Sequence, residues 1–293
     1  MFTQAELAVL RRAYARQVTF LGNVRNANLE RAYAEVPREA YLGPGPWPIL
    51  RWPSYPSRPG YTPTPDADPA WLYADTLVGI VPERGLNNGQ PSAHACWIAA
   101  AAPSMGEHVV HVGAGVGYYS AIMAHMVGSA GTVTAIEYDP QLASRATANF
   151  ARAPNVEVVQ GDGSVTPFAP ADVIYVNAGA SRPADAWLDG LKEGGRLILP
   201  LTTARNFSTP PAFATLSGAV FGITRRGGDY DAWFVGPIAV FPCEGMRDEV
   251  SEQALAAAFD KGGYRDVKRL RRTDDVADGE CWVKAPGWSL TYH

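Results

Sequence analysis

The sequence predicts an α/β domain built on a doubly wound, mostly parallel sheet, and three observations lead to this expectation. An apolar, β-type run at residues 109–112 ends in glycines spaced by two, and a helix-like stretch follows at residues 120–126. Four further β-type runs come after it. The second to fourth strands each end in a polar or Gly-rich step, and in open α/β sheets such steps share the rim at which ligands bind.

The first 75 residues are expected to form helices and an arm ahead of the core. Thr3-Gln4-Ala5-Glu6 matches a capping box and predicts a helix to about residue 17. A second short helix is expected at residues 28–34, before Pro37. From Tyr41 to Trp71, nine prolines alternate with aromatic residues. This arm is expected to be neither helix nor central strand, and to lie on the domain as a pocket wall or as a packed surface loop.

The core is expected at residues 76–245, followed by a C-terminal α/β extension at residues 246–293. Gly227-Gly228 signals a hairpin between residues 218–226 and 230–241. In the extension, we expect a helix at residues 252–259 and two late strands at residues 266–270 and 281–284. The remaining core strands are expected at residues 132–136, 156–160, 172–176 and 196–199.

The Gly-rich turn suits a nucleotide-like cofactor, since glycine tolerates the tight turn and a helix N-terminus offers free N–H groups. Tyr118 stands where the dinucleotide pattern requires its third glycine. We therefore expect a cofactor without a pyrophosphate, S-adenosylmethionine. Glu137 lies about 20 residues past the turn, where an acid can take both ribose hydroxyls, and Asp162 is expected near an adenine edge. The expected cofactor-binding residues are His111, Gly113, Gly115, Gly117, Tyr118, Glu137, Asp162, Gly163 and Asn177.

Composition restricts the choice of partner. The net charge is −4 and no Lys/Arg block stands out, which disfavours nucleic acid. The three cysteines fit neither a disulfide framework nor a zinc site, and the five histidines lack metal-ligand spacing, so no metal is expected. Residues 1–10 lack the apolar region of a signal peptide, and no run is apolar enough to span a bilayer. A cytoplasmic protein without membrane partners is expected.

Six segments carry a family resemblance, namely residues 36–41, 73–75, 90–91, 112–118, 161–163 and 191–200. In this order they resemble protein-L-isoaspartate O-methyltransferases. The resemblance covers about residues 28–245 and leaves aside the Pro-rich arm, which looks like an insertion. It implies a class I methyltransferase fold, with a seven-stranded sheet and helices on both faces, S-adenosylmethionine as methyl donor and a carboxylate as acceptor.

Two positions depart from the family pattern. The family usually has a serine close to the reacting carboxylate, in a loop where this chain has Gly89, which predicts weak or absent activity on isoaspartyl peptides. Ser92 is a substitute to consider, and Gly89, Gln90 and Ser92 are the candidate catalytic residues. His111 stands where the family usually has an acid. A neutral histidine can keep part of that role, whereas a charged one would oppose the sulfonium.

The function expected from these observations is carboxyl O-methylation of a peptide or protein. An ionised carboxylate needs placement and desolvation rather than a base. Two alternatives stay open: a methyltransferase of the same fold that acts on a modified peptide natural product or a small acid, and a cofactor-binding protein without turnover. His94, in an apolar helix-like stretch, is either a positioning group or a packed structural residue.

Overall fold

The computed structural model describes residues 2–51, 60–203 and 216–293 of the chain. Both N-terminal helices are present, α1 (Gln4–Leu21) and α2 (Ala27–Glu35), followed by the short α3 (Glu39–Leu42). The predicted capping box is confirmed, because the Thr3 hydroxyl accepts from Glu6 N–H and the Glu6 carboxylate accepts from Thr3 N–H. α1 runs past residue 17 because no breaker occurs before Gly22.

The five predicted core strands form the parallel part of the central sheet. They are β5 (His108–Val112), β6 (Thr132–Glu137), β7 (Val156–Gln160), β8 (Ala171–Val176) and β9 (Leu191–Thr203), in the spatial order β7-β6-β5-β8-β9. Val110 of β5 pairs with Thr134 on one side and Ile174 on the other. β9 is longer than predicted because its second half pairs with the next strand along almost its whole length.

The rest of the sheet is antiparallel. The predicted hairpin is β10 (Leu216–Arg226) and β11 (Asp229–Val240). Beyond it lie β12 (Arg269–Arg271), β14 (Trp288–Thr291) and β13 (Cys281–Ala285), so the described sheet has ten strands rather than seven. The strands β5 to β11 supply the seven expected strands, and the C-terminal extension adds the other three to the same sheet. The expected mostly parallel pairing holds for the part that carries the Gly-rich turn.

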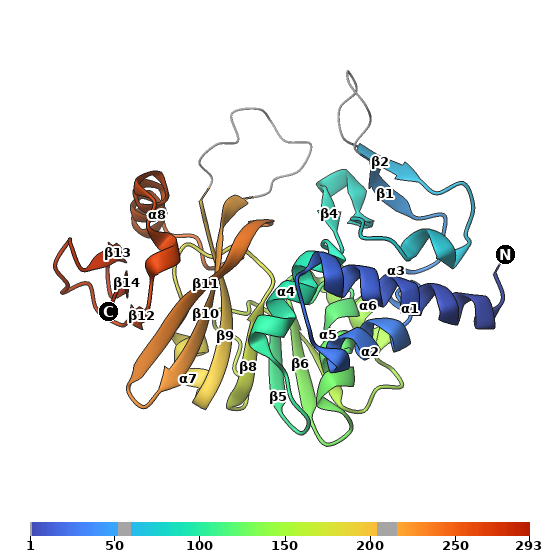
Figure 1. Cartoon of the computed structure of the whole chain (residues 1–293), viewed down its shortest axis with the longest axis horizontal. Coiled ribbons are helices and arrows are strands. Elements are labelled where there is room, and N and C mark those ends of the chain that lie inside the picture. Colours follow the sequence, from blue (N-terminus) through green and yellow to red (C-terminus); the bar gives the residue numbers. More distant parts are fainter. Residues whose placement is uncertain (1, 52–59, 204–215) are drawn as a thin grey trace.

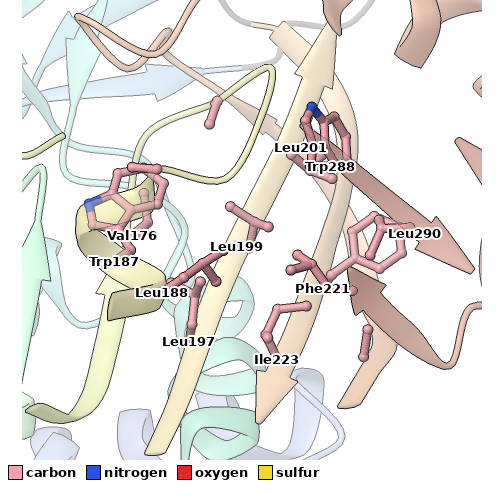
Figure 2. Packing of buried hydrophobic residues seen from close by; sticks show 14 of the residues in the cluster. Val176, Trp187, Leu188, Leu197, Leu199, Leu201, Phe221, Ile223, Trp288 and Leu290 are labelled. Carbon is pink, nitrogen blue, oxygen red and sulfur yellow. The ribbon is translucent and has the colours of Figure 1, made fainter. Parts of the chain in front are cut away.

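Helices cover both faces of this sheet (Figure 1). α1, α2, α4 (Pro91–Ala101) and α5 (Tyr118–Val127) pack on one face, while α7 (Asp185–Gly190) and α8 (Glu249–Lys261) pack on the other. Successive strand residues serve the two faces, so that Val109 joins one core and Val110 the other. Figure 2 shows the second core, in which Trp187, Phe221 and Trp288 surround the leucines of β9. Burying one leucine or phenylalanine side chain of this core contributes about 1.5–3 kcal/mol to the stability of the fold.

The Pro-rich arm forms a small hairpin of its own, outside the central sheet. β1 (Pro48–Arg51) pairs antiparallel with β2 (Gly60–Pro63), and a second short pair, β3 (Gly79–Val81) and β4 (Leu86–Asn87), follows. Trp47 is buried beside Leu72 and Val78, which fixes the arm on the domain. The prolines keep both strands short and off the main sheet, as the sequence predicts. Trp52 lies outside the described residues.

The remaining elements are α6 (Pro140–Asn149), which contacts β6 and β7, and three single-turn 3₁₀ helices. Those turns are η1 (Pro69–Leu72), η2 (Pro82–Arg84) and η3 (Tyr264–Asp266). Over the described ranges, no helix has the length and apolar character needed to cross a membrane.

Candidate active site

A cavity of ≈ 740 Å³ lies at the carboxyl ends of the parallel strands, within the usual size range of small-molecule sites. Its walls come from the residues that follow β5, β6, β7 and β8, from the start of α4, and from residues 237–244 after the middle of β11. The sequence predicts this rim as the binding edge of the sheet, and the structure places this cavity there.

The Gly-rich turn after β5 forms the centre of the wall. Gly113, Gly115 and Gly117 have φ values of +77°, +58° and +94°, which side chains rarely tolerate. A Cβ on Gly115 would point into the cavity, with Ile80 Cδ1 as its nearest neighbour at 3.8 Å. A Cβ on Gly117 would instead lie 2.4 Å from the Phe150 ring. Gly115 therefore leaves room for a ligand, whereas Gly117 leaves room for Phe150.

Glu137 is fastened to this turn. Its Oε2 accepts from Gly115 N–H over 2.6 Å and its Oε1 accepts from Asp139 N–H over 2.9 Å. The side chain is only 8% exposed and lines the cavity. Burial raises the pKa of Glu137, and the two N–H donors oppose that shift. A carboxylate has about four lone-pair positions, so Glu137 retains two with which to accept hydrogen bonds from a ligand.

The next residues of the wall extend the polar edge around Glu137. Arg84, in η2, pairs with Asp139, and this hydrogen bond lowers the pKa of the Asp139 carboxyl. Both side chains line the cavity. Sequence reasoning missed this pair because nothing in residues 82–84 distinguishes a cavity arginine from a surface one.

Asn177 and Gly163 close the wall beside the turn. Asn177 N–H donates to Val112 O and its side-chain amide donates to Gly113 O, so the ends of β5 and β8 are tied together. Trp187 Nε1 donates to Gly163 O over 2.7 Å and fixes that loop from the opposite core. Both predicted residues, Asn177 and Gly163, lie on the cavity.

On the other side of the cavity, the start of α4 is held by Asp75. The Asp75 carboxylate accepts from Ser92 N–H, from the Ser92 hydroxyl and from Gln90 Nε2, over 2.8, 2.7 and 2.9 Å. Ser92 does not line the cavity, and its only hydroxyl proton is given to Asp75. The structure thus offers no support for Ser92 as a substitute for the family serine, while Gln90 does line the cavity.

Arg38 fixes the loop that carries Asp75. Its guanidinium is fully buried and donates to the carbonyl oxygens of Leu72, Ala74 and Thr76 over 2.9, 3.3 and 2.9 Å. The segments around Arg38 and Asp75 are part of the family resemblance, but sequence reasoning gave neither residue a role. Neither has a signal of its own, since each acts through a carbonyl or an amide far away in the sequence.

Gly89 and His94 face each other at this end of the cavity, and both line it. Gly89 has φ +73°, and a Cβ there would lie 2.2 Å from His94 Nε2. The His94 ring stacks on Tyr119, with ring centroids 3.5 Å apart, and its Nδ1 lies 2.8 Å from Tyr175 Oη. Burial, ahead of the neighbouring His111 and Arg38, lowers the pKa of His94 well below its ordinary value. His94 is therefore a neutral, oriented imidazole on the cavity wall.

Besides Gly117, three other predicted cofactor residues lie behind the wall. His111 is fully buried with Nδ1 2.7 Å from Ser120 Oγ, and burial lowers its pKa to about 3, so it is uncharged at pH 7. Tyr118 is buried beside the Arg38 guanidinium. Asp162 Oδ1 accepts from the N–H and hydroxyl of Ser164, and the neighbours Gly161 and Gly163 line the cavity whereas Asp162 does not.

Of the twelve predicted site residues, the structure therefore brings seven to the cavity wall. The other five pack or form hydrogen bonds just outside it. On the wall are Gly89, Gln90, Gly113, Gly115, Glu137, Gly163 and Asn177, and off it are Ser92, His111, Gly117, Tyr118 and Asp162.

Two stretches of the wall were not predicted as site residues. Residues 237–244 reach the rim because β10 is antiparallel to β9 and β11 is antiparallel to β10. β11 therefore runs in the same direction as the parallel strands and ends at their carboxyl edge. Leu50, from β1 of the arm, also lines the cavity, so the arm does contribute to a pocket wall. Its described tryptophans do not: Trp47 is buried elsewhere, and Trp71 is half exposed and donates to Asp66.

Comparison with known proteins identifies the family. The family model for protein-L-isoaspartate(D-aspartate) O-methyltransferase matches residues 68–209. A protein-L-isoaspartate O-methyltransferase from Methanopyrus kandleri is 30% identical over 201 residues, which is 66% of this chain and 78% of that protein. The chain belongs to the protein-L-isoaspartate O-methyltransferase family.

Other members of this family match less of their own length. A Thermotoga maritima relative is 31% identical over 180 residues, 59% of this chain and 50% of that protein. The chain spans about half the length of several curated relatives that it matches.

Solved structures of family members show the same fold. One protein-L-isoaspartate O-methyltransferase superimposes with a TM-score of 0.62 at 23% identity, covering 85% of this chain and 69% of that one. A protein from Plasmodium falciparum, described as a putative family member in complex with S-adenosyl-L-homocysteine, superimposes with a TM-score of 0.58 at 18% identity, covering 80% and 98%. The predicted class I methyltransferase fold is thereby confirmed.

Proposed function

We propose that this chain is an S-adenosylmethionine-dependent carboxyl O-methyltransferase that acts on a peptide or protein carboxylate. The observation that carries the proposal is the Gly115–Glu137 hydrogen bond on the wall of a ≈ 740 Å³ cavity at the carboxyl rim of the sheet. It combines an open backbone turn with a buried acceptor for hydroxyl groups, which suits a nucleoside. The names of the family's curated members and the S-adenosyl-L-homocysteine complex of one relative support the same cofactor and reaction.

Each wall residue has a role in this proposal. The free lone pairs of Glu137 accept from the two ribose hydroxyls, and Gly115 leaves the space that the cofactor fills. Gly113, Gly163 and Asn177 form the adjoining wall. Asp162, His111, Gly117 and Tyr118 act from behind it, by fixing the turn and its loops. His111 stays neutral at pH 7, so this position adds no positive charge near a sulfonium.

When bound, the cofactor supplies an electrophilic methyl group. The protein's residues have to bind and orient the cofactor and the acceptor, and to exclude water from them. A carboxylate is already ionised at pH 7 and needs no base. Over the described residues, no group of three or more His, Cys, Asp or Glu side chains could hold a metal ion. The apolar residues of 237–244 and Trp97 cover the acceptor end and lower its water content.

The direct test has two parts. Calorimetry is expected to show binding of S-adenosylmethionine and S-adenosylhomocysteine, and absence of binding by folded protein would contradict the proposal. Transfer of labelled methyl is then measured on an isoaspartyl peptide, with the matching aspartyl peptide as control. Base-labile incorporation is expected from a methyl ester, whereas base-stable incorporation would contradict carboxyl transfer.

The remaining expectations belong to this proposal as well. They are a cytoplasmic location, no nucleic-acid or membrane partner, and a division at residues 75 and 245 into arm, core and extension. A small acid or a modified peptide natural product stays the alternative acceptor. Cofactor binding without transfer to any of these acceptors would favour the binding protein without turnover.

A further inference from the structure

The acceptor end of the cavity lacks the side chain expected at residue 89 and holds an imidazole in its place. A Cβ on Gly89 would overlap His94 Nε2 at 2.2 Å, so a serine at position 89 and the present His94 cannot coexist without movement. His94 Nε2 has no hydrogen-bond partner among the described residues, and it is not among the buried polar atoms sealed from solvent. Nε2 is therefore a free polar atom open to the cavity.

The tautomer of His94 follows from its other nitrogen. Tyr175 is fully buried, and its hydroxyl contacts only His94 Nδ1 among the described hydrogen bonds. An unused hydroxyl hydrogen costs more than an unused lone pair, so Tyr175 Oη donates and Nδ1 accepts. Burial raises the pKa of Tyr175 well above its ordinary value, which keeps that proton in place. A neutral imidazole whose Nδ1 accepts carries its own proton on Nε2.

We propose that the Nε2–H of His94 donates a hydrogen bond to the methyl-accepting carboxylate, in the position where the family serine would present its hydroxyl. This inference rests on the proposed function and identifies the group that recognises its acceptor. Gly89 is a specificity-determining residue, because its missing side chain gives the imidazole access to the cavity. Tyr175 is a positioning residue that acts through the tautomer of His94.

A neutral donor suits this transfer. The carboxylate loses negative charge as the methyl group arrives, so a cationic partner would bind the reactant more strongly than the transition state. The stacking on Tyr119 and the hydrogen bond to Tyr175 hold the ring from two directions. The carboxylate can therefore be oriented without being neutralised. This donor also offsets the missing serine, and we expect measurable transfer to an isoaspartyl peptide.

The kinetic test uses the full-length chain with S-adenosylmethionine and the isoaspartyl peptide. H94A is expected to lower kcat/KM for the peptide by about ten- to a hundredfold, the effect of one hydrogen bond to a charged group. H94Q keeps an N–H donor and is expected to recover part of that loss. The matched control is H125Q, since His125 pairs with Glu35 away from the cavity. In all three variants, the dissociation constant for S-adenosylhomocysteine is expected to stay within about threefold of wild type.

The spectroscopic test reads the tautomer directly. Nitrogen-15 NMR of the full chain is expected to show His94 protonated on Nε2, and Y175F is expected to shift it toward a mixture with the Nδ1–H form. A His94 protonated on Nδ1 in wild type would overturn the inference even with full activity. Unchanged peptide kinetics in H94A would do the same. If wild type binds the cofactor but methylates no peptide carboxylate, the proposed function fails, and the inference fails with it.

Discussion

Ser92 donates two hydrogen bonds to Asp75, one from its backbone N–H to Oδ1 over 2.8 Å and one from its hydroxyl to Oδ2 over 2.7 Å. α4 begins at Pro91 and has no side-chain cap from the preceding Gln90. Asp75 therefore caps the helix from a separate loop and places negative charge at its N-terminus. Because α4 carries His94 and follows Gly89, this contact fixes the end of the cavity that the proposed function assigns to the acceptor.

We predict that D75N destabilises the protein and weakens acceptor use. The amide retains one acceptor oxygen but loses the charge at the helix N-terminus, so the free energy of unfolding should fall by about 1–2 kcal/mol. The displaced α4 start should raise KM for the peptide while the affinity for S-adenosylhomocysteine stays unchanged. Urea denaturation and calorimetry measure the two effects. A variant with wild-type stability and peptide KM would show that the contact does not position the site.

Glu137→Ala is predicted to weaken cofactor binding. Removing the carboxylate leaves the ribose hydroxyls without acceptors and releases Gly115 N–H, at a cost of about 1–3 kcal/mol. Calorimetry with S-adenosylhomocysteine measures this change. Glu107→Ala is the matched control, because Glu107 lies before β5 at the other end of the strand and pairs with Arg196. Equal affinities in wild type and the Glu137 variant would rule out Glu137 as the ribose ligand.

Two glycines of the turn are predicted to respond differently to substitution. Gly115→Val fills the space into which its Cβ points and should abolish cofactor binding with modest loss of stability. Gly117→Ala forces Phe150 to move and should lower stability while cofactor affinity in the folded fraction remains. Both positions have positive φ, so each substitution adds backbone strain, and the β-branched valine adds more than the alanine. Cofactor affinity separates the two variants, because only the side chain at position 115 enters the cavity. Retained binding in Gly115→Val would place the cofactor elsewhere.

The sequence predicts the local elements of this fold well, because their signals are local. The capping box at residues 3–6, the strand before Gly113 and the hairpin at Gly227-Gly228 are each specified by neighbouring residues. The C-terminal strands could be predicted only in part. Pro286-Gly287 marks a turn between β13 and β14, and the sequence analysis did not use it. The pairing of β14 with β12 depends on contacts distant in the sequence.

The candidate site also combines residues with local sequence signals and residues whose position depends on distant contacts. Gly115 and Glu137 could be predicted because the spacing between two strand ends brings them to one rim. Ser92 and Asp162 do not line the cavity, and their hydrogen bonds with Asp75 and Ser164 could not be predicted from residue type alone. From the sequence alone, His94 can have either a structural or a positioning role. Only its distance from Gly89 reveals that the missing side chain and the imidazole occupy one space.

The last prediction concerns acid stability and His111. Burial lowers the pKa of His111 from 6.5 to about 3 in the folded chain. Between these two pH values the unfolded chain binds a proton at this residue and the folded chain does not. The contribution of His111 to stability is therefore fully present above pH 6.5, and it falls by about 1.4 kcal/mol for each pH unit from there down to about pH 3.

His111→Asn keeps a group that can hydrogen-bond to Ser120 but does not titrate in this range. Its free energy of unfolding should depend on pH less steeply than that of wild type, by about one proton between pH 6 and pH 4. Urea denaturation of both proteins at pH 7, 6, 5 and 4 measures the two slopes. His94 also has a lowered pKa and remains in the variant, so part of the acid sensitivity should persist. Parallel slopes would show that His111 is solvated or already charged in the folded protein. That result would contradict a neutral His111 behind the Gly-rich turn.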